Sequence, residues 1–249
     1  MALMPKCRLA GPMEYLHLEH DGKLLLVDEQ GVGPLIPVPG RSECNEGWTM
    51  RLPTVEEVAE MGIEWSEKRR NLLNWGQYRA TVIHGLPHID WPEHWAWKDD
   101  LIGDSAVHPA ARESVYRTMH RLVSKVMIID VQDRVVMAKV KRGHFVGAWT
   151  LPGGYLDYGE NPGDGAVREA MEELGIDISL SDERPVISQN IFTEEGINFV
   201  SFTYRSQVDA KTLQFALKAD EIEEVGWFSK DEALARAASW FDKSALHGL

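Results

Sequence analysis

The sequence predicts an α+β protein made of two parts. Short apolar segments with alternating or β-branched residues indicate strands, and a few amphipathic helices lie between them. The pattern also changes near residue 120, from a hairpin, short helices and a tryptophan-rich segment to apolar strands around one well-capped helix. A chain of 249 residues with 44% hydrophobic residues can bury the cores of two domains. We therefore expect a smaller α+β domain at 1–120 and a second domain with a mixed sheet at 121–249.

The first part begins with a predicted β-hairpin, because alternating residues flank the Asp21-Gly22 dipeptide, which suits a turn with positive φ. Thr54 and Glu57 form the pattern of a capping box and open a short helix that stops at Gly62. The other expected elements are a loop or edge strand at 31–41, a helix at 67–75, a strand at 78–85, a loop at 88–100 whose indole rings cover a small core, and a helix from 109 to about 121.

The second part contains one helix with clear ends. Asn161 is its expected N-cap, Pro162 takes the first helical position, and Gly175 is the expected C-terminal glycine. A glycine loop at Gly153 and Gly154 leads into this helix. The other expected elements are strands at 123–130, 135–141, 186–192, 197–208 and 223–228, and a last helix from 231 to about 238.

Composition excludes several classes of protein. The net charge of -13 and the pI near 5.1 argue against nucleic-acid binding, which needs clustered Lys and Arg. Cys7 and Cys44 are too few for a four-thiolate zinc site and are expected to be two unrelated thiols. No apolar run is long enough for a membrane span, and the first residues lack the apolar core of a signal peptide. We expect a soluble cytoplasmic protein with no membrane partner.

Three glutamates, Glu169, Glu172 and Glu173, lie within five residues of the capped helix. At about 100° per residue they share one face, where like charges repel unless a cation binds them. Carboxylate oxygens prefer hard divalent cations, so we expect a Mg²⁺ or Mn²⁺ site on a face that points outward. The opposite face is expected to pack on the core through Val167, Ala170, Met171 and Leu174.

Two further residues are expected to support this site. Arg168 can make two hydrogen bonds to one carboxylate, and Glu160 at the far end of the glycine loop is the candidate partner. Such a pair would hold the loop against the helix. Metal ions that bridge phosphate oxygens neutralise the charge of a diphosphate and lower the pKa of an attacking water. The residues therefore indicate a metal-dependent reaction at a diphosphate.

The segment from Gly154 to Ile176 resembles the signature of the Nudix hydrolases. Five residues separate Gly154 from Glu160, seven separate Glu160 from Arg168, and the sequence then reads REAMEELGI. The family pattern is Gly-x5-Glu-x7-Arg-Glu-U-x-Glu-Glu-x-Gly-U, in which U is bulky and apolar. All seven fixed residues are present, and the one departure is Ala170, which concerns helix packing more than catalysis. The compatible strand order extends the resemblance over about residues 125 to 240.

The resemblance implies a fold, a site and a reaction. The fold is an α/β/α sandwich with a mixed sheet. Glu169, Glu172 and Glu173 would coordinate Mg²⁺ or Mn²⁺ together with the carbonyl of Gly153. A further acid would come from a late loop, with Glu221 as the best candidate and Glu194 and Glu195 as rivals. The reaction would be hydrolysis of a nucleoside diphosphate linked to another group, and the identity of the general base stays open.

The substrate and the role of the first part also stay open. Sequence markers of several Nudix subfamilies are missing, so a nucleotide sugar, an ADP-ribose-like compound and a dinucleotide all remain. An isomerase of the same fold would need a cysteine near the metal, and Cys7 and Cys44 lie outside the Nudix half. A non-catalytic nucleotide-binding or regulatory module is the alternative, which the intact acidic residues disfavour. For residues 1–120 we expect a role in covering the nucleotide or in forming a homodimer.

Overall fold

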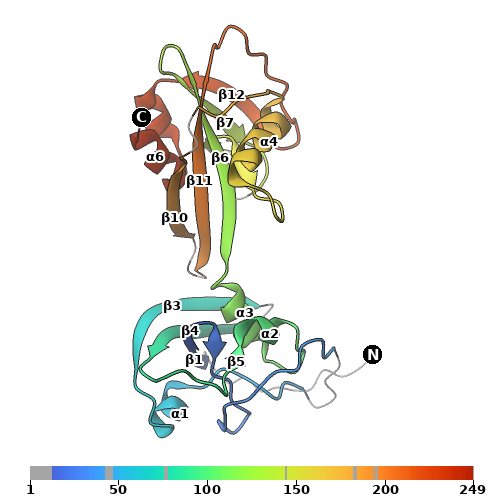
Figure 1. Cartoon of the computed structure of the whole chain (residues 1–249), viewed down its shortest axis with the longest axis vertical. Coiled ribbons are helices and arrows are strands. Elements are labelled where there is room, and N and C mark those ends of the chain that lie inside the picture. Colours follow the sequence, from blue (N-terminus) through green and yellow to red (C-terminus); the bar gives the residue numbers. More distant parts are fainter. Residues whose placement is uncertain are drawn as a thin grey trace. The chain divides into compact units, whose positions relative to one another are not determined.

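The computed structural model describes residues 13–42, 47–75, 78–143, 145–181, 184–192, 194 and 196–248 (Figure 1). The chain forms two compact units, residues 1–119 with 192–197 and residues 120–191 with 198–249. Cys7, Cys44 and Glu195, which were assigned roles from the sequence, lie outside the described residues. Within the described part of the chain, no helix is long and apolar enough to cross a bilayer.

The first unit is built around a five-stranded sheet. The hairpin predicted at its start is present, and its turn holds Asp21 and Gly22 at φ values of 45° and 87°. The first strand pairs antiparallel with the second and parallel with the fourth. The strands are β1 (Met13–His20), β2 (Lys23–Leu24), β3 (Trp65–Trp75), β4 (Tyr78–Pro87) and β5 (Ala96–Trp97), in the order β3-β4-β1-β2-β5.

The helix predicted at 67–75 is wrong, because this segment is strand β3. Its side chains alternate, with Asn71 and Leu73 buried on one side and Arg70 exposed on the other. Arg69 and Asn71 on the inward face are polar, which hides the period of two from a hydrophobicity pattern. An extended antiparallel ladder with β4 decides the conformation, since pairing in a sheet outweighs the weak helical preference of the segment.

Three short helices accompany this sheet. The predicted capping box is present, because the Thr54 side chain accepts from the Glu57 N–H and the Glu57 carboxylate accepts from the Thr54 N–H. The predicted helix from 109 to about 121 ends earlier, at Tyr116, and no glycine or proline marks that end in the sequence. The helices are α1 (Val55–Glu60), α2 (Lys98–Ile102) and α3 (Pro109–Tyr116).

The tryptophan-rich segment is more ordered than the loop that was predicted. It forms β5 and continues into α2. Trp95 is buried in a small core with Leu16, Leu18 and Ile83, as expected. Trp91 and Trp97 are about half exposed, and the Lys23 ammonium lies 4.8 Å from the ring centroid of Trp97. Only one of these three indoles therefore belongs to the core.

The second unit contains a seven-stranded mixed sheet. Strand β6 pairs parallel with β11 and antiparallel with β7, so the predicted hairpin at 123–141 is present. Two short strands extend the sheet, because β8 pairs with β7 and β9 pairs with β6. The strands are β6 (His120–Asp130), β7 (Val135–Val140), β8 (Trp149–Thr150), β9 (Gly153–Tyr155), β10 (Val186–Phe192), β11 (Ile197–Val208) and β12 (Ile222–Phe228), with the main order β10-β11-β6-β7-β12.

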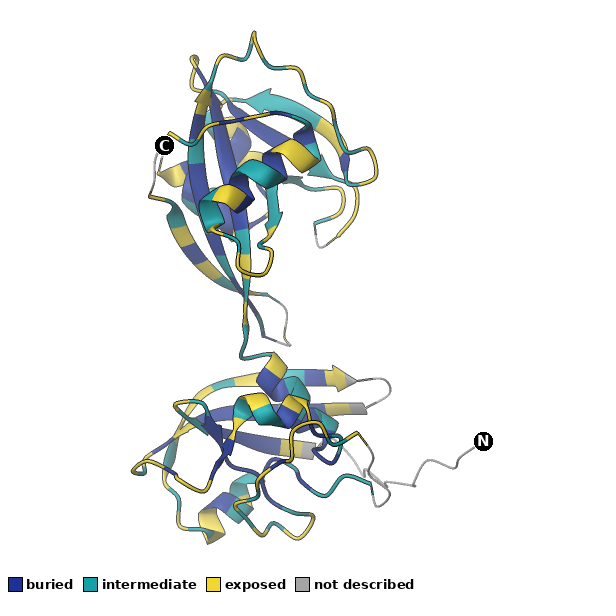
Figure 2. Cartoon of the chain, turned by 45° about the vertical axis from the view of Figure 1, so that its right-hand side comes forward, coloured by how far each residue is buried: buried dark blue, intermediate teal, exposed yellow. Residues whose placement is uncertain are grey.

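Helices cover both faces of this sheet, which confirms the predicted α/β/α sandwich. Val126 and Ile128 of β6 face helix α4 (Pro162–Leu174). The alternate residues Met127 and Ile129 face α5 (Lys230–Arg236) and α6 (Trp240–His247). Because side chains alternate along a strand, one apolar segment supplies both cores, and Figure 2 shows this strand buried between the helices.

His108 provides a test of the first unit at low pH. Its imidazole is buried at the N-cap of α3, where Nδ1 accepts from the Ala110 N–H at 3.1 Å. Burial, together with Arg51 and Arg112, lowers the pKa of His108 to about 4. A folded-state pKa below the unfolded value means that His108 stabilises the fold above about pH 6.5 and that this contribution is lost as the pH falls towards 4.

We therefore expect His108→Asn, which keeps a capping oxygen, to lose less stability than the native chain when the pH falls from 7 to 4.5. The difference in the free energy of unfolding should be about 1–2 kcal/mol, measured by urea denaturation at both pH values. The exposed His88 is the matched control, and His88→Asn should follow the native chain. Parallel pH profiles for the native chain and His108→Asn would contradict the assignment.

Candidate active site

Helix α4 carries the acidic cluster, and both of its ends lie where the sequence predicts them. The Asn161 side chain accepts from the Gly163 N–H at 2.9 Å, and Gly175 ends the helix in the left-handed region, with φ of 66°. The predicted core face needs one correction, since Met171 is 47% exposed. The buried row is instead Ala166, Ala170 and Leu174, at spacings of four residues.

The expectation that all three glutamates point outward is wrong for Glu169. Its side chain is buried because α4 lies directly over strand β9. A Cβ on Gly154 would lie 2.6 Å from Glu169 Oε1, and a Cβ on Gly153 would lie 2.2 Å from the Ser124 carbonyl oxygen. Both distances are below any real contact of a Cβ atom. The two glycines of the loop are therefore what allows the glutamate helix to approach the sheet.

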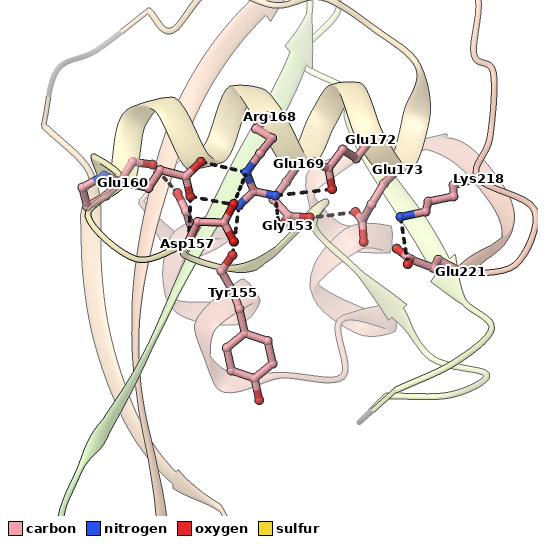
Figure 3. Close-up of polar contacts among 12 residues, drawn as sticks. Gly153, Tyr155, Asp157, Glu160, Arg168, Glu169, Glu172, Glu173, Lys218 and Glu221 are labelled. Atoms are coloured by element: carbon pink, nitrogen blue, oxygen red, sulfur yellow. Dashed lines mark hydrogen bonds and ion pairs between the residues drawn. The ribbon is translucent and has the colours of Figure 1, made fainter.

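Arg168 connects the glycine loop to the helix (Figure 3). Its guanidinium makes the two hydrogen bonds expected from the sequence to Glu160, at 2.7 and 2.9 Å. It also donates to the Tyr155 carbonyl at 3.0 Å and to Glu169 Oε1 at 2.9 Å, and it lies 3.4 Å from a Glu172 oxygen. The Arg168 hydrogen bonds lower the pKa of Glu160 to about 2. One side chain thus holds three separate parts of the signature together.

Glu173 occupies a different environment from its two neighbours. Its carboxylate accepts from the Gly153 N–H at 3.0 Å. Burial, together with the negative charges of Glu169 and Glu221, raises the pKa of Glu173 to about 7, although the Gly153 hydrogen bond acts in the opposite direction. Burial is also the main cause that raises the pKa of Glu169, whereas Glu172 is exposed. The cluster therefore holds more negative charge than its surroundings balance.

The loop before β12 brings Glu221 to this cluster. The Glu221 carboxylate forms ion pairs with Lys218 at 3.0 Å and with Arg142. Of the two described candidates for a late acid, Glu221 is the one whose charge acts on Glu169 and Glu173. Glu194 is exposed and groups with the first unit.

The same loop is bonded directly to the end of α4. The Ala216 N–H donates to the Leu174 carbonyl at 2.8 Å, and the Lys218 N–H donates to the Glu173 carbonyl at 3.0 Å. These carbonyls belong to the last turn of the helix, which has no partners within the helix itself. The loop therefore satisfies the end of the helix and is positioned by it.

The donors of this site suit a hard cation in their chemistry. Glu169, Glu172, Glu173 and Glu221 offer only carboxylate oxygens, and Mg²⁺ and Mn²⁺ prefer oxygen ligands. In the described part of the chain, no three His, Cys, Asp or Glu side chains converge as a metal centre. The carboxylates are instead paired with Arg168, Lys218, Arg142 and the Gly153 N–H. A cation could take the place of these partners.

A buried ion pair beside the cluster was not predicted. Lys125 of β6 and Asp242 of α6 are both buried, and Lys125 Nζ lies 2.6 Å from Asp242 Oδ1. The positive charge of Lys125 lowers the pKa of Glu173. A single lysine in an apolar strand was a signal that could have been used, because buried lysines are almost always paired. Asp242 lies in the terminal segment and gave no such signal.

Known proteins are similar to part of this chain. The chain is 36% identical over 106 residues to the putative 8-oxo-dGTP diphosphatase 3 of Mycobacterium tuberculosis, covering 39% of this chain and 47% of that protein. It is 34% identical over 58 residues to the ADP-ribose pyrophosphatase of Methanocaldococcus jannaschii, covering 23% of this chain and 34% of that protein. A MutT NUDIX hydrolase structure from Burkholderia pseudomallei matches with a TM-score of 0.45 and 27% identity, covering 52% of this chain and 97% of that one.

The alignments span less than half the length of the two named relatives. Residues 119–249 match the NUDIX domain as a family. Because that match extends over more than half of the chain and includes the complete signature from Gly154 to Ile176, this chain belongs to the Nudix family.

Proposed function

We propose that this protein is a divalent-metal-dependent hydrolase of a diphosphate bond in a nucleoside diphosphate linked to another group. The observation that carries the proposal is the meeting of four acids, Glu169, Glu172, Glu173 and Glu221, beside the glycine loop of β9. Burial raises the pKa values of two of these carboxylates, which means that their charged forms are disfavoured in the folded protein. The excess of negative charge therefore does not stabilise the fold. A site that binds a cation explains it.

The four acids and the carbonyl of Gly153 would hold Mg²⁺ or Mn²⁺. When bound, the cation would neutralise charge on the diphosphate and lower the pKa of an attacking water. The protein's own residues have separate tasks. Arg168 and Glu160 act as positioning residues, because their two hydrogen bonds fix the loop relative to the helix. Glu173, held by the Gly153 N–H, keeps one carboxylate at the loop.

Two substrate classes are supported by different observations. A substituted nucleoside diphosphate follows from the signature and from the ADP-ribose pyrophosphatase among the relatives. An oxidised purine nucleoside triphosphate is suggested by relatives named as putative 8-oxo-dGTP diphosphatases, which match over more of this chain. A non-catalytic nucleotide-binding module is the remaining alternative, and it is disfavoured because every acid of the signature is retained.

A substrate panel separates these possibilities. Nucleotide sugars, ADP-ribose, dinucleoside polyphosphates and 8-oxo-dGTP would be incubated with Mg²⁺ or Mn²⁺, and the products resolved by chromatography. The proposal expects a nucleoside monophosphate product from at least one of them, formed only with a divalent cation. Binding of nucleotides with no turnover of any compound would favour the non-catalytic alternative.

Replacement of the acidic cluster tests the site. Glu172→Gln and Glu173→Gln should each lower kcat by roughly 10²–10³-fold, because an amide is a far weaker ligand for a hard cation than a carboxylate. Glu224→Gln, on an exposed position of β12, is the matched control and should leave kcat unchanged. Near-normal turnover in both cluster variants would remove the assignment.

The pair of Arg168 and Glu160 should act as one unit. Arg168→Lys loses the paired geometry of the guanidinium, so we expect kcat to fall by roughly 10–100-fold and the Mg²⁺ concentration for half-maximal activity to rise. Glu160→Gln should have a similar effect, and the double variant should be little worse than either single one. Additive effects, or an unchanged Mg²⁺ dependence, would show that the pair does not position the acids.

A further inference from the structure

A row of basic and imidazole side chains crosses three neighbouring strands of the first unit. In the parallel pair β1 and β4, His17 lies opposite His84. In the antiparallel pair β3 and β4, Arg69 lies opposite the same His84. Residues that are in register on adjacent strands project from the same face of a sheet. The row is therefore His17, His84 and Arg69, and Figure 1 shows the three strands that carry it.

An irregularity in β3 produces this register. The pairing shifts between Glu67 and Arg69, so Lys68 is an extra residue on the bulged strand. A bulge changes the direction of the side chains that follow it. Without this shift, Arg69 would not face His84. The bulge thus brings two consecutive cations, Lys68 and Arg69, to the end of the row.

The row borders a cavity of about 320 Å³ that lies entirely in the first unit. This volume is in the lower range of pockets that bind small molecules. Apart from the three residues of the row, the cavity is lined by charged side chains and by a short stretch of β4. The lining residues are His17, Glu19, Asp21, Lys68, Arg69, His84, Gly85, Leu86 and Thr118.

The cations of the cavity have no ion-pair partners among the described residues. No hydrogen bond or salt bridge reaches the side chain of Lys68 or Arg69 in that part of the chain. Burial lowers the pKa of Arg69, and the attraction of Glu19 only partly offsets this effect. Glu19 is itself engaged, because its carboxylate accepts from Lys98 Nζ at 2.8 Å and lies 3.2 Å from His17 Nε2. A half-buried guanidinium is thus left without a counterion.

The two histidines differ in how well they are satisfied. His17 Nδ1 is 2.8 Å from Ser114 Oγ, and Ser114 donates to the Ala111 carbonyl. Ser114 is fully buried and its proton is already donated, so this group is no catalytic nucleophile. The ring of His84 contacts that of His17 at 4.5 Å, and His84 Nε2 is buried without any partner within the described residues. An unpaired buried nitrogen is unfavourable, and such groups often indicate a missing ligand.

We propose that this cavity binds the phosphate group of a small molecule through Arg69, Lys68 and His84. A guanidinium offers paired donors that match phosphate oxygens, and a lysine adds a point charge. An imidazole adds a further donor, so the set suits an anion with three or four oxygens better than a carboxylate with two. The site belongs to a different unit from the acids of α4, and it does not depend on the hydrolase assignment.

Isothermal titration calorimetry of the full chain tests the proposal. The probes are inorganic phosphate, a nucleoside monophosphate and acetate, each in EDTA so that no divalent cation bridges a phosphate to α4. We expect the two phosphate compounds to bind with Kd at or below about 1 mM and acetate to bind at least about tenfold more weakly. Comparison of free phosphate with the monophosphate shows whether the rest of the ligand adds affinity.

Variants locate the binding. Arg69→Gln should weaken phosphate binding by at least about tenfold, and Lys68→Gln, on an exposed position, should weaken it by several-fold. Arg79→Gln, an exposed arginine at the other end of β4, and Glu172→Gln on α4 should bind phosphate as the native chain does. Because Lys68 is exposed, its replacement does not threaten folding.

Four results would overturn the proposal. The first is no binding of either phosphate compound up to about 10 mM, the range in which a Kd near 1 mM gives saturation. The second is unchanged binding in both Arg69→Gln and Lys68→Gln. The third is acetate binding as tight as that of phosphate. Loss of binding in Glu172→Gln with retention in Arg69→Gln would also overturn it, since the anion would then belong to the site on α4.

Discussion

The hydrogen bonds of the Arg168 guanidinium are the constraint on which the rest of the site depends. Its three partners are Glu160 in a loop, the Tyr155 carbonyl in a strand and Glu169 in a helix. All three offer acceptor oxygens to Arg168, so they are not held together by hydrogen bonds to one another. Only a planar group with several donors can serve all three oxygens at once. The loop from β9 to α4 thereby has a defined path although it contains few apolar side chains, and the position of Glu169 follows from it.

Close backbone approach is the second requirement. Gly153 lets β9 lie close against β6, and Gly154 leaves room for the Glu169 carboxylate of α4. A side chain at either position would meet a different obstacle. At Gly153 the obstacle is the backbone of β6, and at Gly154 it is the carboxylate of Glu169. The difference in pKa between the loop acid Glu160 and the helix acid Glu173 is found at this junction. Glu160 has a pKa of about 2 beside Arg168, whereas burial gives Glu173 a pKa of about 7.

Much of the second unit could be predicted, because its signals are local. The caps of α4, the pairing of Arg168 with Glu160 and the strands of the sandwich all follow from residues close in sequence. The burial of Glu169 could not, since it depends on a glycine fifteen positions earlier folding under the helix.

Strand β3 of the first unit could not be predicted for the same kind of reason. Its conformation comes from pairing with β4, and its polar inward residues Arg69 and Asn71 resemble the exposed face of a helix. The row of His17, His84 and Arg69 needs the register of three strands, which no local pattern contains.

The attachment of the loop before β12 to the last turn of α4 has a consequence for how this chain tolerates change. The backbone N–H groups of Ala216 and Lys218 donate hydrogen bonds to the carbonyls of Leu174 and Glu173. The loop that carries Glu221 is therefore positioned directly on the helix that carries the other acids. Residues 209–212 lie ahead of that attachment and outside the core, so we expect a change in their number to leave Glu221 in place. An insertion between Lys218 and Glu221 would instead displace the acid from the helix. We therefore expect the loop to vary in length before Ala216, where additional residues would form new surface. The segment between Lys218 and Glu221 should keep a constant length.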